Sequence, residues 1–201
     1  MPWFWLVAGP NGAGKTTLVS AGVVRRASGL DLLSLNADER TAAILARDPD
    51  APDANLQAAI ETDARVAACI ETRLDFLVET VLSSGKYLDD VVRAHELGYQ
   101  IGMIYVGLAK PAASLRRVRQ RVARGGHDVP PDRIRARWSR SITMLGRFVP
   151  LLDRLFIYDN SSLSGPVLIA RKIGGRDRPV ALLVPGRIPE IDAVLTAAGP
   201  A

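Results

Sequence analysis

The pattern that most restricts the fold of this chain lies close to its start. Residues 9–16, GPNGAGKT, match the phosphate-binding pattern G-x-x-x-x-G-K-[ST] without departure. An apolar run at residues 3–8 precedes the pattern, and residues 15–26 with helical spacing follow it. Glycine weakens both strands and helices, so three glycines here indicate a loop that wraps closely around phosphate oxygens. The order of strand, loop and helix predicts a nucleotide triphosphate site.

Within this loop, each polar residue has a predicted task. The backbone N–H groups and the positive end of the following helix face the phosphates. Lys15 is predicted to bridge the β- and γ-phosphates, and the Thr16 hydroxyl is the predicted Mg²⁺ ligand. The predicted cofactors are therefore ATP and Mg²⁺. The residues predicted to bind ATP are Gly9, Pro10, Asn11, Gly12, Ala13, Gly14, Lys15, Thr16, Thr17 and Asn160.

The rest of the chain alternates apolar runs with segments of helical spacing. Further strands are predicted at residues 30–35, 76–78, 101–108 and 155–158, with a terminal β-hairpin at residues 167–171 and 180–184. Helices are predicted at residues 38–47, 55–73, 89–97, 111–122, 132–148 and 189–198. This alternation predicts an α/β three-layer fold with a parallel central sheet, and residues 1–201 are interpreted as a single domain. Ligands bind at the carboxyl ends of such strands, where Gly9 and residues 36–38, 79–80 and 159–160 should converge.

Composition excludes several classes of protein. Of 201 residues, 48% are hydrophobic, which suffices for one α/β core. The single cysteine, Cys69, rules out an internal disulfide framework and a cysteine-based zinc site, and it is interpreted as a structural thiol. No apolar run reaches the length of a membrane span and no signal peptide is recognised, so we expect a cytoplasmic protein without a membrane partner.

The polar residues that follow other strands favour a small-molecule kinase. The chain has no guanine-reading N-K-x-D pattern, and neither residues 102–108 nor 155–160 form a strong apolar strand ending in an acid for Mg²⁺. Asp38 is predicted to be the base that takes a proton from an acceptor hydroxyl, its alternative being a helix N-cap, and Glu39 is a competitor for the base. Glu79 and Thr80 are predicted to bind acceptor hydroxyls, while the alternative for Glu79 is a surface acid.

A dense group of arginines predicts a lid over this site. The net charge is +5, and nine arginines fall in one window: Arg116, Arg117, Arg119, Arg121, Arg124, Arg133, Arg135, Arg137 and Arg140. Two helices carry them on either side of a glycine-containing turn, so residues 116–140 are predicted to close over the γ-phosphate and stabilise its charge. Further candidates for phosphate contact in the lid are Arg124, His127, Arg133 and Arg137. For His127, a cap of the turn is the alternative.

Several motifs, taken together, resemble the zeta toxin family. They are AGPNGAGKTTL, LNADE, FLVETVLSSG, GYQIGMIYVGL, RVRQRVARGGHDVP, IRARWSRSITML and YDNSS, in this order and over most of the chain. The resemblance implies a P-loop kinase fold similar to nucleoside monophosphate kinases, and phosphorylation of UDP-N-acetylglucosamine as the activity. It implies an antitoxin protein that blocks the ATP site.

The resemblance also implies roles for individual residues. Asp38 occupies the family's general-base position and Lys15 its ATP-lysine position. Glu79 and Thr80 match the residues that contact the acceptor sugar, and Arg121 resembles the first γ-phosphate arginine, while the second is Arg124, Arg133 or Arg137. The GGHDVP segment departs from the better-known toxins, which leaves the acceptor open.

The leading hypothesis is an ATP- and Mg²⁺-dependent kinase that phosphorylates a hydroxyl of a small molecule, with a UDP-sugar as the candidate acceptor. Two alternatives remain beside it. One is a P-loop NTPase that binds nucleic acid through the arginine window. Nucleic acid is the less favoured partner, because almost no aromatic residues stand between these arginines. The other is an ATP-binding relative without catalytic activity.

Overall fold

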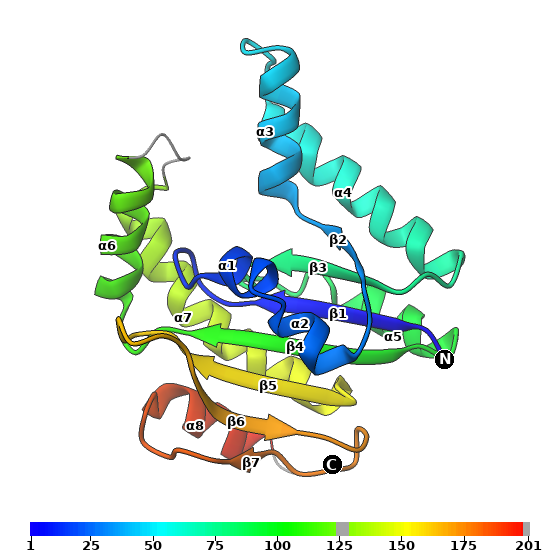
Figure 1. Ribbon diagram of the computed structural model, residues 1–201, viewed down its shortest axis with the longest axis vertical. Coiled ribbons are helices and arrows are strands. Elements are labelled where there is room, and N and C mark those ends of the chain that lie inside the picture. The colour runs from blue at the N-terminus through cyan, green and yellow to red at the C-terminus, as the bar shows by residue number, and fades with distance from the viewer. Residues whose placement is uncertain (124–128, 199–201) are drawn as a thin grey trace.

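The computed structural model describes residues 1–123 and 129–198 (Figure 1). The strands are β1 (Trp3–Ala8), β2 (Leu33–Leu35), β3 (Phe76–Thr80), β4 (Gln100–Gly107), β5 (Arg154–Asp159), β6 (Val167–Lys172) and β7 (Ala181–Leu182). The helices are α1 (Lys15–Ser20), α2 (Val23–Ser28), α3 (Ala37–Arg47), α4 (Ala54–Glu71), α5 (Leu88–Glu96), α6 (Pro111–Val122), α7 (Pro131–Phe148) and α8 (Pro189–Ala197).

In the described part of the chain, the strands form one sheet in the order β2-β3-β1-β4-β5-β6-β7. The first five of these strands run parallel, whereas β6 pairs antiparallel with β5 and β7 pairs antiparallel with β6. The central strand β1 is buried along its whole length, as its unbroken apolar sequence predicts. The carboxyl ends of β1, β3, β4 and β5 therefore share one edge of the sheet.

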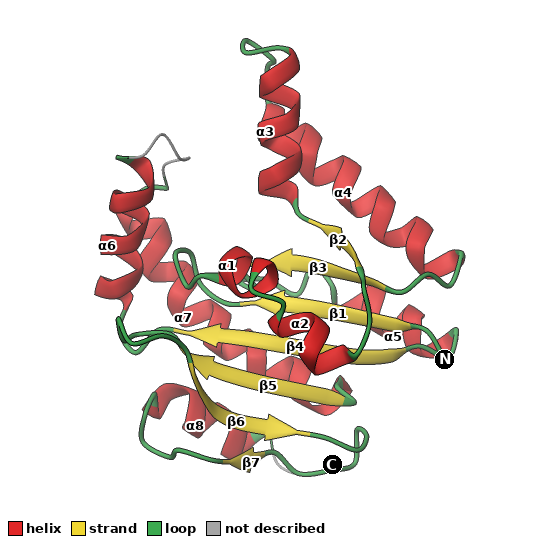
Figure 2. Cartoon of the chain, in the orientation of Figure 1, coloured by secondary structure: helices red, strands yellow, loops and turns green. Residues whose placement is uncertain are grey.

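Helices cover both faces of the sheet (Figure 2). On one face, Leu18 of α1 and Val24 of α2 pack against Trp5 and Val7 of β1. On the other face, a larger core joins the sheet to the apolar sides of α4, α5, α7 and α8. The paired helices α3 and α4 stand beside the β2 edge, with α3 extending away from the sheet (Figure 1). The expected α/β architecture with a parallel central sheet is confirmed.

Some element boundaries differ from the sequence expectation. The helix predicted at residues 15–26 is divided into α1 and α2, because Gly22 adopts a left-handed φ of 71° that a continuous helix cannot contain. Only Leu33–Leu35 of the predicted second strand pairs with β3, and only Ala181–Leu182 of the last predicted strand pairs with β6. Strand β3 extends to Thr80, because its pairing with β1 continues to the end of that strand.

Candidate active site

The phosphate-binding loop joins β1 to α1 and is tightly wound. Gly9, Gly12 and Gly14 have φ angles of 141°, 72° and 93°, a region that side chains rarely adopt. A Cβ atom on Gly9 would lie 2.2 Å from the carbonyl oxygen of Val106 in β4. A Cβ atom on Gly14 would lie 2.7 Å from Nδ2 of Asn160. The loop thus requires glycine for its conformation and for its close approach to β4 and to the end of β5.

Lys15 begins α1, and its side chain folds back over the loop. The ammonium group donates hydrogen bonds to the carbonyl oxygens of Gly9 at 2.9 Å and Pro10 at 3.4 Å. Burial lowers the pKa of Lys15 to about 8, although the negative charges of Glu79 and Asp38 act to raise it. The ammonium group is therefore held at the carboxyl end of β1 by neutral carbonyl oxygens. A bound triphosphate would give it an anionic partner, which forms stronger hydrogen bonds than these carbonyls do.

Thr16 lies directly against a carboxylate. Its hydroxyl donates a hydrogen bond of 2.9 Å to Oε2 of Glu79. The ladder between β1 and β3 places Glu79 there, because Val7 is its register partner. Burial raises the pKa of Glu79, against the hydrogen bond from Thr16 and the charge of Lys15. Its other oxygen, Oε1, is buried and has no hydrogen-bond partner of ordinary geometry among the described residues, while the Asn36 side chain acts on the same carboxylate and also lowers its pKa.

This contact brings Glu79, which was predicted to bind acceptor hydroxyls, against Thr16, the predicted Mg²⁺ ligand. An apolar strand ending in an acid was sought at β4 and β5, whereas β3, with the sequence FLVET, carries one. A hydroxyl and a carboxylate oxygen at this separation form the donor set that Mg²⁺ prefers beside nucleotide phosphates. Elsewhere in the described residues, no group of three or more His, Cys, Asp or Glu side chains gathers as a metal site.

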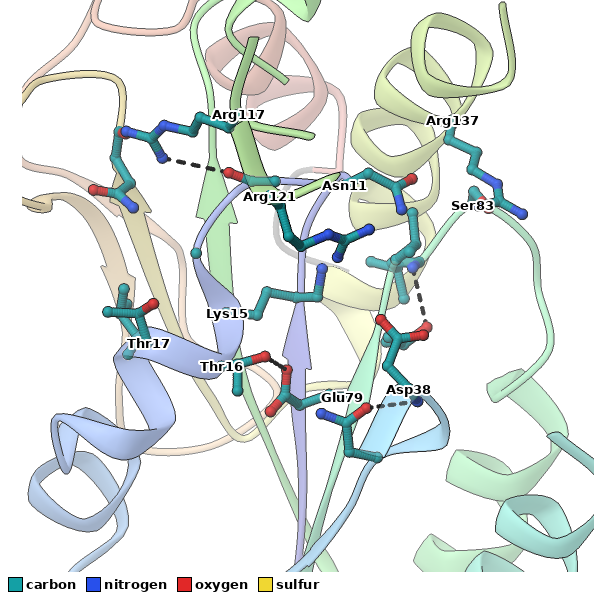
Figure 3. Close-up of a pocket in the computed structure, with 18 of the residues that line it drawn as sticks. Asn11, Lys15, Thr16, Thr17, Asp38, Glu79, Ser83, Arg117, Arg121 and Arg137 are labelled. Carbon is teal, nitrogen blue, oxygen red and sulfur yellow. Dashed lines mark hydrogen bonds between the residues drawn. The ribbon is translucent and has the colours of Figure 1, made fainter. Parts of the chain in front are cut away.

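Asp38 lies at the exposed start of α3, and it is not the helix cap. The cap is Asn36, whose Oδ1 accepts hydrogen bonds from the backbone N–H groups of Asp38 at 2.9 Å and Glu39 at 3.5 Å. The N-cap alternative for Asp38 is therefore wrong, and its carboxylate is left facing the pocket (Figure 3). Thr80, which ends β3, is instead engaged locally, because its hydroxyl accepts a hydrogen bond from the backbone of Leu82 at 3.0 Å.

The loop, Asp38 and the end of β3 surround one cavity of about 860 Å³. Arg121 and Arg137 also line it, and Arg121 lies near enough to Lys15 for its charge to act on that amine (Figure 3). Arg133 is exposed and does not line this cavity. Arg124 and His127 lie outside the described residues. The cavity is thus lined from both arms of the predicted lid, by Arg117 and Arg121 of α6 and by Arg137 of α7.

A leucine in this cavity has an unusual backbone conformation. Leu82 has a φ of 55° and is 2% exposed, so its side chain packs inward while the backbone is strained. It follows Thr80 in the turn that leads to Ser83 and Ser84, and all of these line the cavity. Strain of this kind is typical of sites where a loop must present polar groups in one fixed arrangement.

Arg117, one of the nine arginines in the predicted lid window, is bound directly to the phosphate-binding loop. Its guanidinium donates hydrogen bonds to the carbonyl oxygens of Gly12 at 3.4 Å, Ala13 at 3.5 Å and Asn160 at 2.6 Å. The side chain of Asn160 adds a bond of 2.8 Å to the same Ala13 carbonyl. Spacing alone could not distinguish Arg117 from its neighbours, because its partners are backbone carbonyls distant in sequence.

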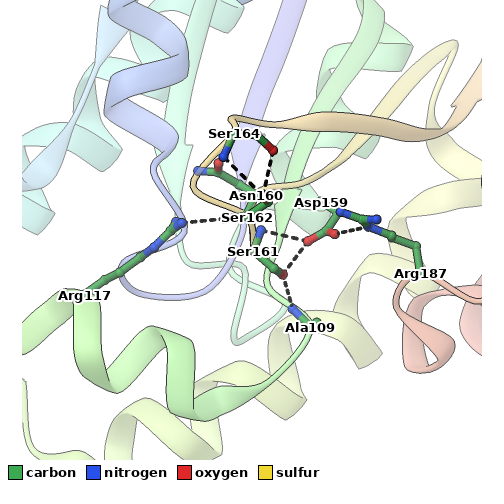
Figure 4. A network of polar contacts seen from close by, with 8 residues as sticks. All are labelled: Ala109, Arg117, Asp159, Asn160, Ser161, Ser162, Ser164 and Arg187. Atoms are coloured by element: carbon green, nitrogen blue, oxygen red, sulfur yellow. Dashed lines mark hydrogen bonds and ion pairs between the residues drawn. The ribbon is translucent and has the colours of Figure 1, made fainter.

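Behind Asn160, an ion pair between a buried carboxylate and a partly exposed arginine holds the end of β5 (Figure 4). The Asp159 side chain is 2% exposed and lies 2.6 Å from Nε of Arg187, which precedes α8. Asp159 also accepts hydrogen bonds from the backbone and side chain of Ser161, and the Ser161 hydroxyl accepts one from Ala109 at 2.8 Å. Asp159 therefore faces away from the cavity, while the next residue, Asn160, faces it.

Across the described residues, none of the helices combines the length and the apolar character needed to cross a lipid bilayer.

Comparisons with known proteins bear on the family and the fold. The family model for zeta toxins matches residues 1–163. An uncharacterised protein of Haemophilus influenzae is 25% identical over 130 residues, which is 65% of this chain and 88% of that protein.

Two solved structures share the fold. The structure of AvrRxo1-ORF1:-ORF2 with ATP has a TM-score of 0.68 at 18% identity and covers 100% of this chain; the chain spans 64% of that protein's length. The PezAT chromosomal toxin–antitoxin system of Streptococcus pneumoniae gives a TM-score of 0.60 at 16% identity, over 85% of this chain and 72% of that one. Because the family model covers well over half of its length, the chain belongs to the zeta toxin family.

Proposed function

We propose that the protein is an ATP-dependent kinase that transfers the γ-phosphate to a hydroxyl group of a small molecule. The observation that carries this proposal is the single cavity in which the phosphate-binding loop, Asp38 and Arg121 meet. A phosphate cradle alone is compatible with a switch or a motor. A carboxylate across the cavity from the cradle, together with an arginine beside Lys15, is the arrangement that phosphoryl transfer to an alcohol requires.

On the donor side, the loop N–H groups and Lys15 bind the phosphates. Thr16 and Glu79 would hold Mg²⁺, and their contact together with the unpartnered Glu79 Oε1 fits a hard cation. When bound, Mg²⁺ neutralises part of the charge on the β- and γ-phosphates. Glu79 was expected to bind the acceptor, and its contact with Thr16 supports a metal-holding role in its place.

On the acceptor side, Asp38 removes the proton of the attacking hydroxyl as its oxygen bonds to the γ-phosphorus. The bond between that phosphorus and the β–γ bridging oxygen breaks in the same step, and ADP leaves. Arg121 stabilises the charge on the transferred phosphoryl group, because its guanidinium lies beside Lys15 (Figure 3). Thr80, Ser83 and Ser84 offer the acceptor hydroxyl groups for hydrogen bonding, and Arg137 adds a positive charge on the same side. Closure of the predicted lid, residues 116–140, would bring Arg137 nearer to the phosphates.

The acceptor that we propose is a UDP-sugar, with UDP-N-acetylglucosamine as the first candidate. Membership in the zeta toxin family supports it, and so does a cavity of about 860 Å³ that extends from the phosphate-binding loop past Asp38 to Ser83 and Ser84. We also propose an antitoxin partner, because the PezAT structure is described as a toxin–antitoxin system.

The test measures ADP release with ATP, Mg²⁺ and a panel of UDP-sugars, nucleotides and aminoglycosides. Wild type should release ADP in an acceptor-dependent manner. Asp38→Asn should lower kcat at least 100-fold while the ATP dissociation constant changes by less than about threefold, the effect expected of a lost general base. The matched control is Glu39→Gln, the neighbouring acid, which should leave kcat near wild type.

Two outcomes would contradict the proposal. Tight ATP binding without acceptor-dependent turnover on any compound would favour an ATP-binding relative without catalytic activity. A loss of kcat in Glu39→Gln rather than in Asp38→Asn would move the base to the competing residue.

A further inference from the structure

Two buried hydrogen bonds hold the inner side of α7, the helix that carries Arg137. The Trp138 indole donates to the carbonyl oxygen of Leu108 at 2.9 Å, and the hydroxyl groups of Tyr105 and Ser141 lie 3.0 Å apart. Tyr105 and Ser141 are fully buried, and Trp138 is nearly so. Because a buried polar group that loses its partner is costly, these two bonds constrain how α7 lies on the sheet.

Both bonds lead to the strand that lies next to the phosphate-binding loop. Tyr105 belongs to β4, and its register partner in β1 is Ala8, the residue before Gly9. Leu108 directly follows the same strand. The helix is therefore fastened to the pair of strands that also determines where the phosphate-binding loop begins.

Arg137 lies on this part of the helix but is not fastened itself. It lines the cavity (Figure 3), and no hydrogen bond or ion pair joins its side chain to the rest of the described chain. Ser141 is four positions further along α7, so the two residues are neighbours on one helix face. Trp138 is the next residue after Arg137. The direction in which Arg137 leaves the helix therefore depends on how α7 is rotated about its axis.

Apolar packing alone would define that rotation less sharply. Ile142 and Leu145 would still hold α7 on the sheet if the two bonds were lost. Hydrophobic burial has no preferred direction, however, whereas a hydrogen bond weakens when its length or angle changes. Burial raises the pKa of Tyr105, so the hydroxyl pair stays uncharged. A buried polar pair of this kind specifies one arrangement of the elements that it joins.

We propose that Tyr105, Ser141 and Trp138 are positioning residues that orient the guanidinium of Arg137 into the cavity. The inference rests on the proposed function, because Arg137 matters to turnover only if its charge acts on the ATP phosphates or on the acceptor. The three positioning residues touch neither ligand and act through the rotation of α7. Phosphoryl transfer is sensitive to such placement, since a displacement of about 1 Å can cost about 100-fold in rate.

The first test removes the hydroxyl pair without leaving either member unpaired. In the double variant Tyr105→Phe with Ser141→Ala, both polar groups are replaced, so the free energy of unfolding should stay close to that of wild type. With UDP-N-acetylglucosamine as the first acceptor probe, kcat/KM should fall about tenfold. The matched control is Tyr99→Phe, because the Tyr99 hydroxyl is held by the backbone carbonyls of Cys69 and Leu74, before β4 begins. This control should lose stability and keep the wild-type kcat/KM.

A cycle of variants decides whether the loss acts through Arg137. Arg137→Met should lower kcat/KM by more than about tenfold, and adding the double variant of Tyr105 and Ser141 should lower it by less than about twofold more. A further tenfold loss in the Arg137→Met background would show that the hydroxyl pair acts elsewhere, and it would overturn the proposal. A wild-type kcat/KM in the double variant would overturn it as well.

A second measurement needs no turnover. The Nε–Hε signal of Arg137 in ¹⁵N NMR spectra, assigned by its loss in Arg137→Met, should shift in Trp138→Phe and in the double variant of Tyr105 and Ser141. It should stay in place in Tyr99→Phe. A signal that is unmoved in all these variants would overturn the positioning role and leave the kinase proposal standing. A wild type that phosphorylates no acceptor would overturn the proposed function, while the shift of this signal would still decide whether the three residues orient Arg137.

Discussion

Lys15 is a residue whose charge state should control nucleotide affinity. Burial lowers its pKa to about 8 in the free protein, and bound phosphates favour the charged form. Below this pH the amine is already charged, so binding requires no proton. Above it, binding must take up a proton, and affinity falls by up to about tenfold per pH unit.

We therefore expect the ATP dissociation constant to be flat below about pH 7.5 and to rise above pH 8, measured by calorimetry in buffers of different ionisation enthalpy. Lys15→Arg, which stays charged, should bind with a shallower dependence on pH. A constant affinity for wild type across this range would contradict the lowered pKa.

Backbone strain and steric overlap at a glycine of the loop can be separated by comparison with Gly29, which follows α2 outside the loop. Gly14→Ala introduces both a strained φ of 93° and a Cβ atom 2.7 Å from Asn160, whereas Gly29→Ala, at a φ of 79° with no atom within 4 Å, introduces strain alone. We expect Gly29→Ala to lower the free energy of unfolding by about 1 kcal/mol, and Gly14→Ala to cost more and also to weaken ATP binding. Denaturant unfolding of both variants measures the difference, and equal costs would show that the side chain of Asn160 simply moves aside.

At the scale of elements, the start of α3 determines where Asp38 lies. Asn36 caps this helix, so Asn36→Ala should lower stability by about 1 kcal/mol. It should also reduce kcat, because the first turn that carries Asp38 loses its anchor. Asn36→Ser, which can still cap, should restore much of both properties. Reduced kcat in the serine variant at full stability would instead indicate that the Asn36 amide itself acts in the cavity that it lines.

Elements could be predicted from the sequence where local patterns determine them. The apolar run of β1, the glycine loop and the start of α1 follow directly from residue types, and the structure agrees with them. The end of β3 could not be read in this way, because pairing with β1 decides that Glu79 lies within the strand. For the same reason the contact between Glu79 and Thr16 was missed, since residues 63 positions apart meet only through the sheet.

At the scale of the whole molecule, the parallel sheet explains why most candidate residues gather in one place. Loops that follow parallel strands share an edge, so Asp38, Thr80 and Asn160 were expected to meet the phosphate-binding loop, and all three line its cavity. The contacts that the sequence did not predict join residues that are far apart in the chain. Arg117 was one of nine arginines in a window, and its backbone acceptors lie up to 105 positions away. No local spacing encodes such a contact.

The ion pair between Asp159 and Arg187 connects α8 with the nucleotide side of the sheet, and it provides a test at this scale. Arg187→Met leaves the buried Asp159 without its cation, so the free energy of unfolding should fall by about 1–3 kcal/mol, and ATP should bind more weakly. In the double variant Asp159→Asn with Arg187→Met, much of the stability should return. If the single and double variants are equally unstable, the salt bridge contributes less than the packing around it.

Arg187 lies beyond residue 163, where the match to the zeta toxin model ends. It nevertheless fixes the strand end from which Asn160 and Leu163 reach the cavity. Substitutions in this segment are therefore expected to change ATP affinity although they touch none of the motifs shared with the family. Exchanging the segment between family members would tune nucleotide affinity while the catalytic residues stay untouched.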